Sequence, residues 1–183
     1  MTGPLTLHRA VTAALVCCLP VLACDPMSAP LVRTQAGFQV TESGALRIWT
    51  GQECDGVMRV SVELEESDDQ PETAWTLRST SREGATLTEL TLGEAPAGFR
   101  VTAGAATELS WRSMKTVKIS TETKNGNTGS YVSVGALLED AAAHDADEFY
   151  VEDEGWLTLD EFTELTEGDE GVAPLCGPGT YAD

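Results

Sequence analysis

Hydrophobic side chains recur at every second position through much of residues 37–134, which is the period of a half-buried β-strand. In residues 59–65, Val60, Val62 and Leu64 share one face, and the polar residues share the other. We therefore expect one face to be buried and the other to contact water. The same alternation appears in five further pairs: Leu46 and Ile48, Trp75 and Leu77, Phe99 and Val101, Val117 and Ile119, and Val132 and Val134.

Short stretches rich in Gly, Asn and Pro separate these runs and supply the backbone conformations that tight turns need. They are residues 42–44, 54–56, 81–84, 94–98 and 124–129. Between Leu87 and Leu90 the alternation slips, which indicates a β-bulge. The pattern predicts a mainly β fold, namely an antiparallel β-sandwich of about eight strands. An immunoglobulin-like arrangement is one form that this sandwich could take, and an open barrel is the second choice.

From residue 135 onwards the pattern changes to that of a helix, with Leu137 and Leu138 one turn before Ala141 and Ala142. This spacing predicts a short helix that covers one end of the sheets. We expect residues 135–183 to form an acidic helix and hairpin extension that packs on the same domain as the sandwich.

The charge is strongly acidic and unevenly distributed. The sequence has 30 Asp and Glu residues against 11 Lys and Arg, and from residue 125 to residue 183 there are 15 acidic residues and no Lys or Arg. This balance makes nucleic acid and acidic phospholipid poor partners. The acid-rich segment has two interpretations, a solvated face that keeps the protein soluble and a surface that attracts cations or a basic partner.

A short hydrophobic segment, residues 10–23, follows Arg9 near the amino terminus. It is shorter than the roughly 20 residues that a membrane-spanning helix needs, and Pro20 interrupts it. The segment ends in Ala23, a small residue of the kind found before signal cleavage sites. Residues 1–23 therefore have the features of an export signal.

The stretch Val21-Leu22-Ala23-Cys24 resembles the lipobox of bacterial lipoproteins. The resemblance implies that residues 1–23 are a lipoprotein signal peptide and that Cys24 becomes the lipidated first residue. The protein would then be held on the extracytoplasmic face of the cell membrane, because two or three acyl chains are enough for stable anchoring. Residues 24–36 would form a short tether.

Small exported lipoproteins of high-GC Gram-positive bacteria are similar to this chain in make-up. That resemblance implies a location and no reaction. The alternative is an ordinary signal peptide cut near Ala23 or Ala29, which would leave a freely secreted protein.

Cys54 and Cys176 are the cysteines that remain once the signal is removed and Cys24 is assigned to lipid. An extracytoplasmic compartment permits them to form a disulfide, and we expect this pair to be bonded. Two buried thiols and a metal site are the alternatives, and the absence of a CxxC spacing argues against the metal.

Residues from Glu152 to Phe162 resemble the second half of an EF-hand calcium loop, with Gly155 at the sharp turn and Glu161 at the bidentate carboxylate. The resemblance implies Glu152, Glu154 and Glu161 as calcium ligands, although Tyr150 stands where the first aspartate is expected.

A calcium-free interpretation explains the same residues. Residues 149–151 and 156–158 form a hairpin around an acidic turn, and Thr158 and Glu161 form a capping box that opens a helix. We prefer this interpretation and assign no metal ligand.

Two further clusters are candidates for binding. Arg112, Lys115 and Lys118 form the only basic cluster along the chain, and we expect a solvent-facing strand there rather than a phosphate site. The four tryptophans suggest a sugar-binding platform, but Trp75 has the parity of a core residue.

The sequence predicts a location more clearly than an activity. The leading hypothesis is a non-enzymatic, lipid-anchored envelope protein that acts as a binding or interaction module, with an envelope protein as partner and no cofactor. The second is a calcium-responsive domain. The third is a hydrolase with His144 as its base, but no G-x-S-x-G motif surrounds any serine, and we assign no catalytic residue.

Overall fold

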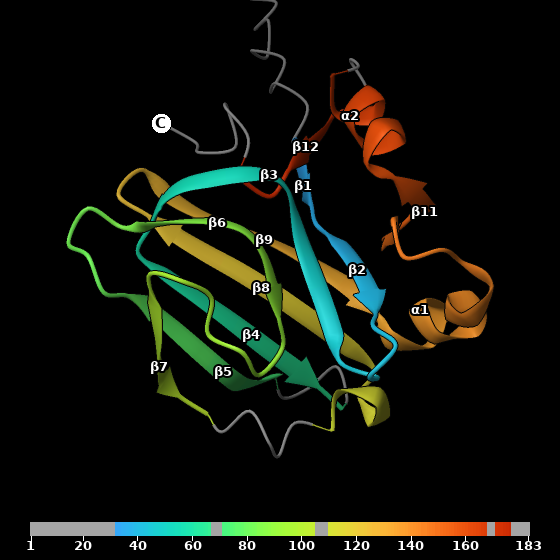
Figure 1. The fold of residues 1–183 in the computed structure, drawn as a ribbon, viewed down its shortest axis with the longest axis horizontal. Helices are drawn as coiled ribbons and strands as arrows, with labels where there is room; N and C mark the ends of the chain where they lie inside the picture. The colour runs from blue at the N-terminus through green and yellow to red at the C-terminus, as the bar shows by residue number, and fades with distance from the viewer. Residues whose placement is uncertain (1–31, 67–70, 105–109, 168–170, 177–183) are drawn as a thin grey trace, which may run out of the picture.

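The computed structural model describes residues 32–66, 71–104, 110–167 and 171–176. Two five-stranded antiparallel sheets face each other, with a short parallel strand pair at one end and short helices around the sheets (Figure 1). The predicted mainly β fold is confirmed, and both sheets are open rather than closed into a barrel. The predicted signal peptide and Cys24 lie outside the described residues.

The first sheet has the strand order β11-β10-β2-β3-β6, and the second has the order β7-β5-β4-β8-β9. The strands of the first sheet are β2 (Gly37–Val40), β3 (Leu46–Val57), β6 (Ala85–Thr91), β10 (Glu148–Val151) and β11 (Gly155–Thr158). Those of the second are β4 (Arg59–Glu65), β5 (Pro71–Ser79), β7 (Phe99–Ala103), β8 (Thr116–Thr123) and β9 (Gly126–Ser133). The parallel pair joins β1 (Arg33–Gln35) to β12 (Val172–Pro174). The helices are α1 (Val134–Asp140), α2 (Leu159–Glu167) and the 3-10 turns η2 (Trp111–Ser113) and η3 (Ala141–Ala143).

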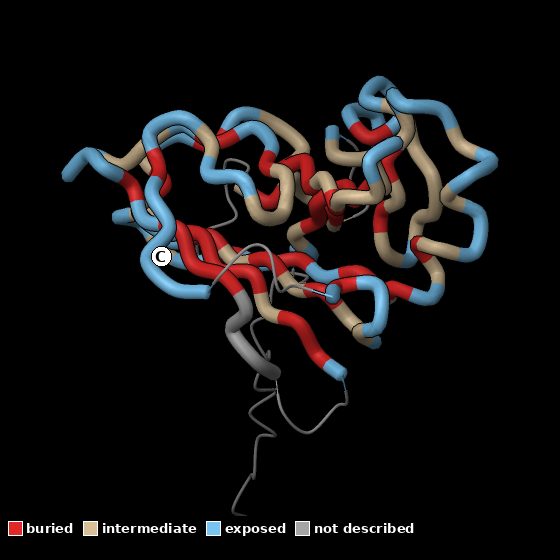
Figure 2. The backbone as a smooth tube through the Cα atoms, turned by 60° about the horizontal axis from the view of Figure 1, so that its bottom comes forward, coloured by how far each residue is buried: buried red, intermediate tan, exposed pale blue. Residues whose placement is uncertain are grey.

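The main core lies between the two sheets and contains nearly all of the alternating hydrophobic residues expected from the sequence. Figure 2 shows the buried residues running along the strands, with exposed residues at the loops. Val101 is an exception, since it is 44% exposed on β7, which is an edge strand with a neighbour on one side only. On β4, Ser61 and Glu65 are also buried, although they alternate with the core residues and were therefore expected on the face that contacts water. Glu65 is compensated by an ion pair with Lys118 at 2.5 Å.

The predicted turn at residues 54–56 is wrong, because these residues lie inside the long strand β3. The pairing of β3 with β6 is irregular opposite Leu87, but the β-bulge predicted between Leu87 and Leu90 is misplaced, because the extra residues are not on β6. Trp49 and Cys54 are five positions apart on β3, whereas their partners Glu89 and Leu87 are two apart on β6. The additional residues therefore belong to β3, which bends without ending.

The acidic extension contributes to the first sheet. The hairpin predicted around residues 152–154 is present as β10 and β11, and β10 pairs with β2. A second small core, made of Trp49, Phe149, Val151 and Phe162, lies between this sheet and α2. The predicted helix after β9 is present as α1, which is followed by η3. The last residues of the predicted tether, Arg33–Gln35, form β1.

The disulfide between Cys54 and Cys176 is present, with the two Cα atoms 5.3 Å apart. It joins β3 to the chain just after β12. The amide of Leu175 also donates to the carbonyl of Thr50 at 3.0 Å, so residues 175 and 176 are fixed to β3 by two links. A disulfide indicates an oxidising compartment. In the described part of the chain, no helix is both long and apolar enough to cross a membrane.

Candidate functional site

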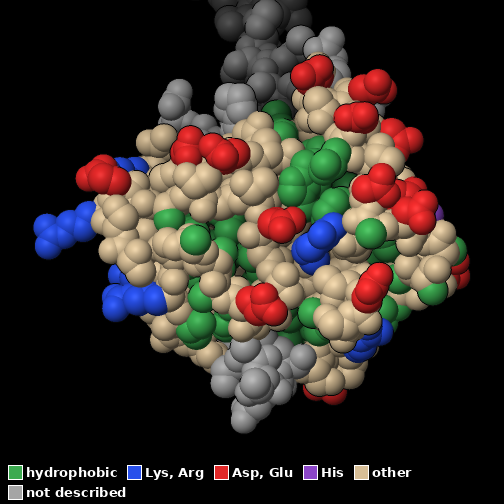
Figure 3. Space-filling view, viewed as in Figure 1, with side chains coloured by type: hydrophobic (Ala, Val, Ile, Leu, Met, Phe, Trp, Pro, Cys, Tyr) green, Lys and Arg blue, Asp and Glu red, His purple; other side chains and the backbone are tan. Residues whose placement is uncertain are grey.

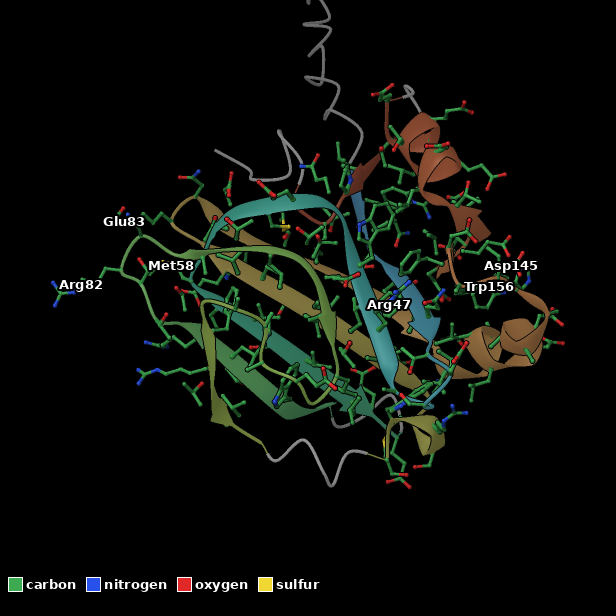
Figure 4. All side chains as sticks on the ribbon, in the orientation of Figure 1. Arg47, Met58, Arg82, Glu83, Asp145 and Trp156 are labelled. Carbon is green, nitrogen blue, oxygen red and sulfur yellow. A yellow bond between two sulfur atoms is a disulfide. The ribbon has the colours of Figure 1, made fainter. Side chains whose placement is uncertain are left out.

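An open groove of about 1020 Å³ lies where the acidic extension meets the first sheet. One wall is formed by residues 39–43, at the end of β2, and by Arg47 of β3. The facing wall is formed by side chains between residues 138 and 146 and by Trp156 of β11. Figure 4 shows Arg47, Asp145 and Trp156 on the same side of the molecule. The groove therefore joins segments that are about 100 residues apart in the sequence, as the hydrogen bond between Arg47 and Ala146 also shows.

A pair of stacked aromatic rings lies on the wall that residues 138–146 and Trp156 form. The rings of His144 and Trp156 lie 4.3 Å apart with 12° between their planes, and Tyr150 contacts Trp156 edge-on at 5.7 Å. The carboxylate of Glu148 fixes the loop, since it lies 3.2 Å from Nδ1 of His144 and accepts a hydrogen bond from the amide of Asp145 at 2.8 Å. Burial, with nearby carboxylates, raises the pKa of the Tyr150 hydroxyl, which therefore stays protonated at neutral pH.

Two arginines are held in place at the groove. Nη2 of Arg47 donates to the carbonyl of Ala146 at 3.0 Å, and its guanidinium lies 4.8 Å from the centre of the Phe149 ring. Nε of Arg47 is buried and has no hydrogen-bond partner among the described residues. Arg112 donates to the carbonyl of Gly44 at 3.3 Å. The groove thus offers fixed cationic donors to a carbonyl or carboxylate group.

The carboxylates implied by the EF-hand resemblance are not gathered around one point. Glu152 accepts from the amide of Ser133 at 2.9 Å, and Glu154 pairs with Arg33 at 3.1 Å. Glu161 accepts from Thr158 instead. Within the described ranges, no group of three or more His, Cys, Asp or Glu side chains could hold a metal ion.

The capping box preferred from the sequence is present at the start of α2. Both the amide and the hydroxyl of Thr158 donate to Oε2 of Glu161 at 2.8 Å. In return, the amide of Glu161 donates to Oγ1 of Thr158 at 3.3 Å. Glu161, which stands at the position of a calcium ligand, therefore uses its carboxylate to accept the hydrogen bonds of Thr158 at the start of the helix.

This capping box predicts a pH dependence. The hydrogen bonds from the Thr158 amide and then from its hydroxyl lower the pKa of Glu161 below its usual value of 4.5. A lowered pKa stabilises the helix start above pH 4.5, and this contribution is lost as the pH falls through the folded-state pKa. An NMR titration of the Thr158 amide should show this loss. Thr158→Ala removes the hydroxyl bond but keeps the stronger backbone amide bond, so the Glu161 titration should move only part of the way up towards 4.5, and a downward shift would contradict the assignment.

Comparison with known proteins identifies no relative. No family model, no curated protein and no solved structure matches the chain. The groove must therefore be interpreted from its own geometry.

The basic cluster expected from the sequence does not form one site. Arg112 lies at the groove, whereas Lys118 pairs with Glu65 on the second sheet. Among the tryptophans, Trp49, Trp75 and Trp111 are at most 8% exposed, and Trp156 lines the groove. Arg47 was not predicted as a site residue, because its one signal in the sequence is its position between the core residues Leu46 and Ile48.

Proposed function

We propose that this chain is a non-enzymatic binding module, held by lipid on the extracytoplasmic face of a cell membrane, whose groove takes a segment of another envelope protein. The Cys54–Cys176 disulfide supports an oxidising location. The lipobox resemblance at Val21-Leu22-Ala23-Cys24 supports anchoring through Cys24.

The observation that carries the binding role is a groove lined by Arg47 and Arg112, with the stacked rings of His144 and Trp156 beside them. Arg47 and Arg112 each give one guanidinium donor to a backbone carbonyl, and a guanidinium has further N–H donors that an incoming carbonyl or carboxylate can accept from. A peptide segment has a carbonyl at every residue, and its side chains can pack on Trp156. The groove is also at or above the upper end of the roughly 300 to 1000 Å³ typical of small-molecule sites.

The test is site-specific photo-crosslinking in intact cells that express the full chain. A photoreactive residue replaces Ala142, which is exposed and lines the groove, and in the matched control it replaces Glu164, which is exposed on α2. We expect one adduct of defined mass from position 142 and none from position 164. Trp156→Ala should reduce that adduct about tenfold or more, the usual effect of removing an aromatic anchor.

The location is tested in the same cells. Cys24→Ser should move the protein out of the membrane fraction and abolish the adduct, and mass spectrometry of the amino-terminal peptide should show a lipidated Cys24.

Equal adducts from both positions would overturn the groove as the binding site. An unmodified thiol at Cys24 would overturn the anchor.

A further inference from the structure

Three arginines occupy one row across adjacent strands of the second sheet. Arg59 on β4 lies directly opposite Arg78 on β5, and Arg78 lies directly opposite Arg100 on β7. Residues that face each other in antiparallel strands point to the same side of the sheet. Arg82, in the turn after β5, completes a group that we call the arginine ladder: Arg59, Arg78, Arg82 and Arg100.

A hollow of about 310 Å³ lies over this ladder. All four arginines line it, together with Met58, Glu122 and residues 79–81, and all four are exposed. Figure 3 shows Lys and Arg side chains gathered at the left edge of the molecule, where Figure 4 labels Arg82 and Met58. The ladder therefore presents its guanidinium groups to solvent.

The four guanidinium groups make no ion pair or hydrogen bond among the described residues. Other cations of the chain do find acidic partners, since Arg33 pairs with Asp153 at 2.9 Å and Lys124 pairs with Glu83 at 2.6 Å. Acidic partners are abundant in a sequence with 30 Asp and Glu residues. Glu122, which faces Arg59 from β8, is the one described carboxylate that lines the hollow, so the four arginines leave it with a net positive charge on an acidic protein.

Such a row is costly to the fold. Like charges that face each other on neighbouring strands repel, because their Cα atoms are only about 4.5 to 5.5 Å apart. Arg78 is the worst placed of the three, since it has an arginine on each side. A bound anion would remove this repulsion.

The shape of the ladder defines the class of anion. Guanidinium groups bind phosphate through two parallel hydrogen bonds, so neighbouring arginines suit neighbouring phosphates. The ladder crosses three strands and is therefore about 10 Å wide. Beyond Arg59 the next residue of the row is Glu122, and the whole chain has a net charge of −19. A long polyanion would extend onto this acidic surface, whereas a short one would not.

We propose that the arginine ladder is a binding site for a compact ligand with two or three linked phosphate groups. The site is separate from the groove, because no residue lines both of them. The ladder can therefore be tested without assuming a partner for the groove.

The test is a calorimetric titration of the full chain with inorganic tripolyphosphate, with orthophosphate and citrate at the same ionic strength. Tripolyphosphate should bind one to one and about tenfold or more tightly than either other anion, because only it supplies several linked phosphates. Arg78→Gln should weaken this binding about tenfold or more. The control Arg33→Gln, which removes an arginine that is already paired, should bind as the unmodified protein does.

Thermal unfolding supplies a second measurement that a purely structural role would not explain. Without ligand, Arg78→Gln should raise Tm by about 1 to 3 °C, because it removes repulsion on both sides. At the same concentration, tripolyphosphate should raise the Tm of the unmodified protein more than that of Arg78→Gln.

Vesicles that carry a polyprenyl diphosphate distinguish the source of the phosphates. Sedimentation of Cys24→Ser, which cannot carry the anchoring lipid, with these vesicles, reversed by tripolyphosphate, would uphold the site and assign it to a lipid headgroup. Tripolyphosphate binding without sedimentation would uphold it for a soluble ligand. The proposal is overturned if tripolyphosphate does not bind, if citrate binds equally well, or if Arg78→Gln binds as tightly as the unmodified protein.

Discussion

Replacing both Cys54 and Cys176 by serine should lower the free energy of unfolding by about 4 to 5 kcal/mol. The bond closes a sequence separation of 122 residues, and the entropy that a cross-link removes from the unfolded chain grows with the length of the closed loop. The loss should appear in urea unfolding as a lower midpoint with a larger slope, because the unfolded chain without the bond exposes more surface.

Reduction supplies the control for this prediction. The unmodified protein in excess reductant should unfold at the same urea concentration as the double serine variant, and reductant should not change the variant. A difference below about 1 kcal/mol between the oxidised protein and the variant would contradict a stabilising cross-link, since it is far under the loop-entropy value.

Gly84→Ala should be among the most destabilising single substitutions in this chain, at about 3 kcal/mol or more. Gly84 has φ +90°, and a Cβ atom added there would lie 2.3 Å from the carbonyl carbon of Gly56. The obstacle is backbone of the adjacent strand β3, so no side-chain rotation can relieve it. The edge of β3 and the turn before β6 would have to separate.

Gly155→Ala is the matched control for this substitution. Gly155 has the same φ of +90°, but an added Cβ atom there would meet nothing within 4 Å. Its cost should be only the left-handed conformation itself, about 1 to 2 kcal/mol. Chemical denaturation of both variants separates the two effects, and equal losses would show that the contact with Gly56 is not a constraint.

The alternating pattern predicted the core because burial between two sheets imposes a period of two on each strand. It was reliable for Val60, Val62 and Leu64, where β4 is a central strand with neighbours on both sides. The turn predicted from composition failed at residues 54–56, where turn-forming residues accommodate a bend inside β3. Gly and Asp permit a turn but do not require the strand to end there.

The groove and the arginine ladder, the two proposed binding surfaces, were not predicted, for a different reason. Parity alone places Arg59, Arg78 and Arg100 on outward positions, but only the register of β4, β5 and β7 makes them neighbours. The groove likewise depends on the return of residues 138–156 to β2, which no local pattern specifies. Residue spacing along one strand is local information, whereas the order of strands in a sheet is set by packing of the whole chain.

The parallel pairing of β1 with β12 has a mechanical consequence. Arg33, near the start of the described chain, pairs with Val172, so a pull on this end loads a three-residue strand in shear against the last strand. The segment after that last strand is joined by sulfur to β3 at Cys54. Traction on the amino-terminal side of β1 would therefore cross the β1–β12 hydrogen bonds and then pass through the disulfide into β3, so the force is shared with a strand of the first sheet.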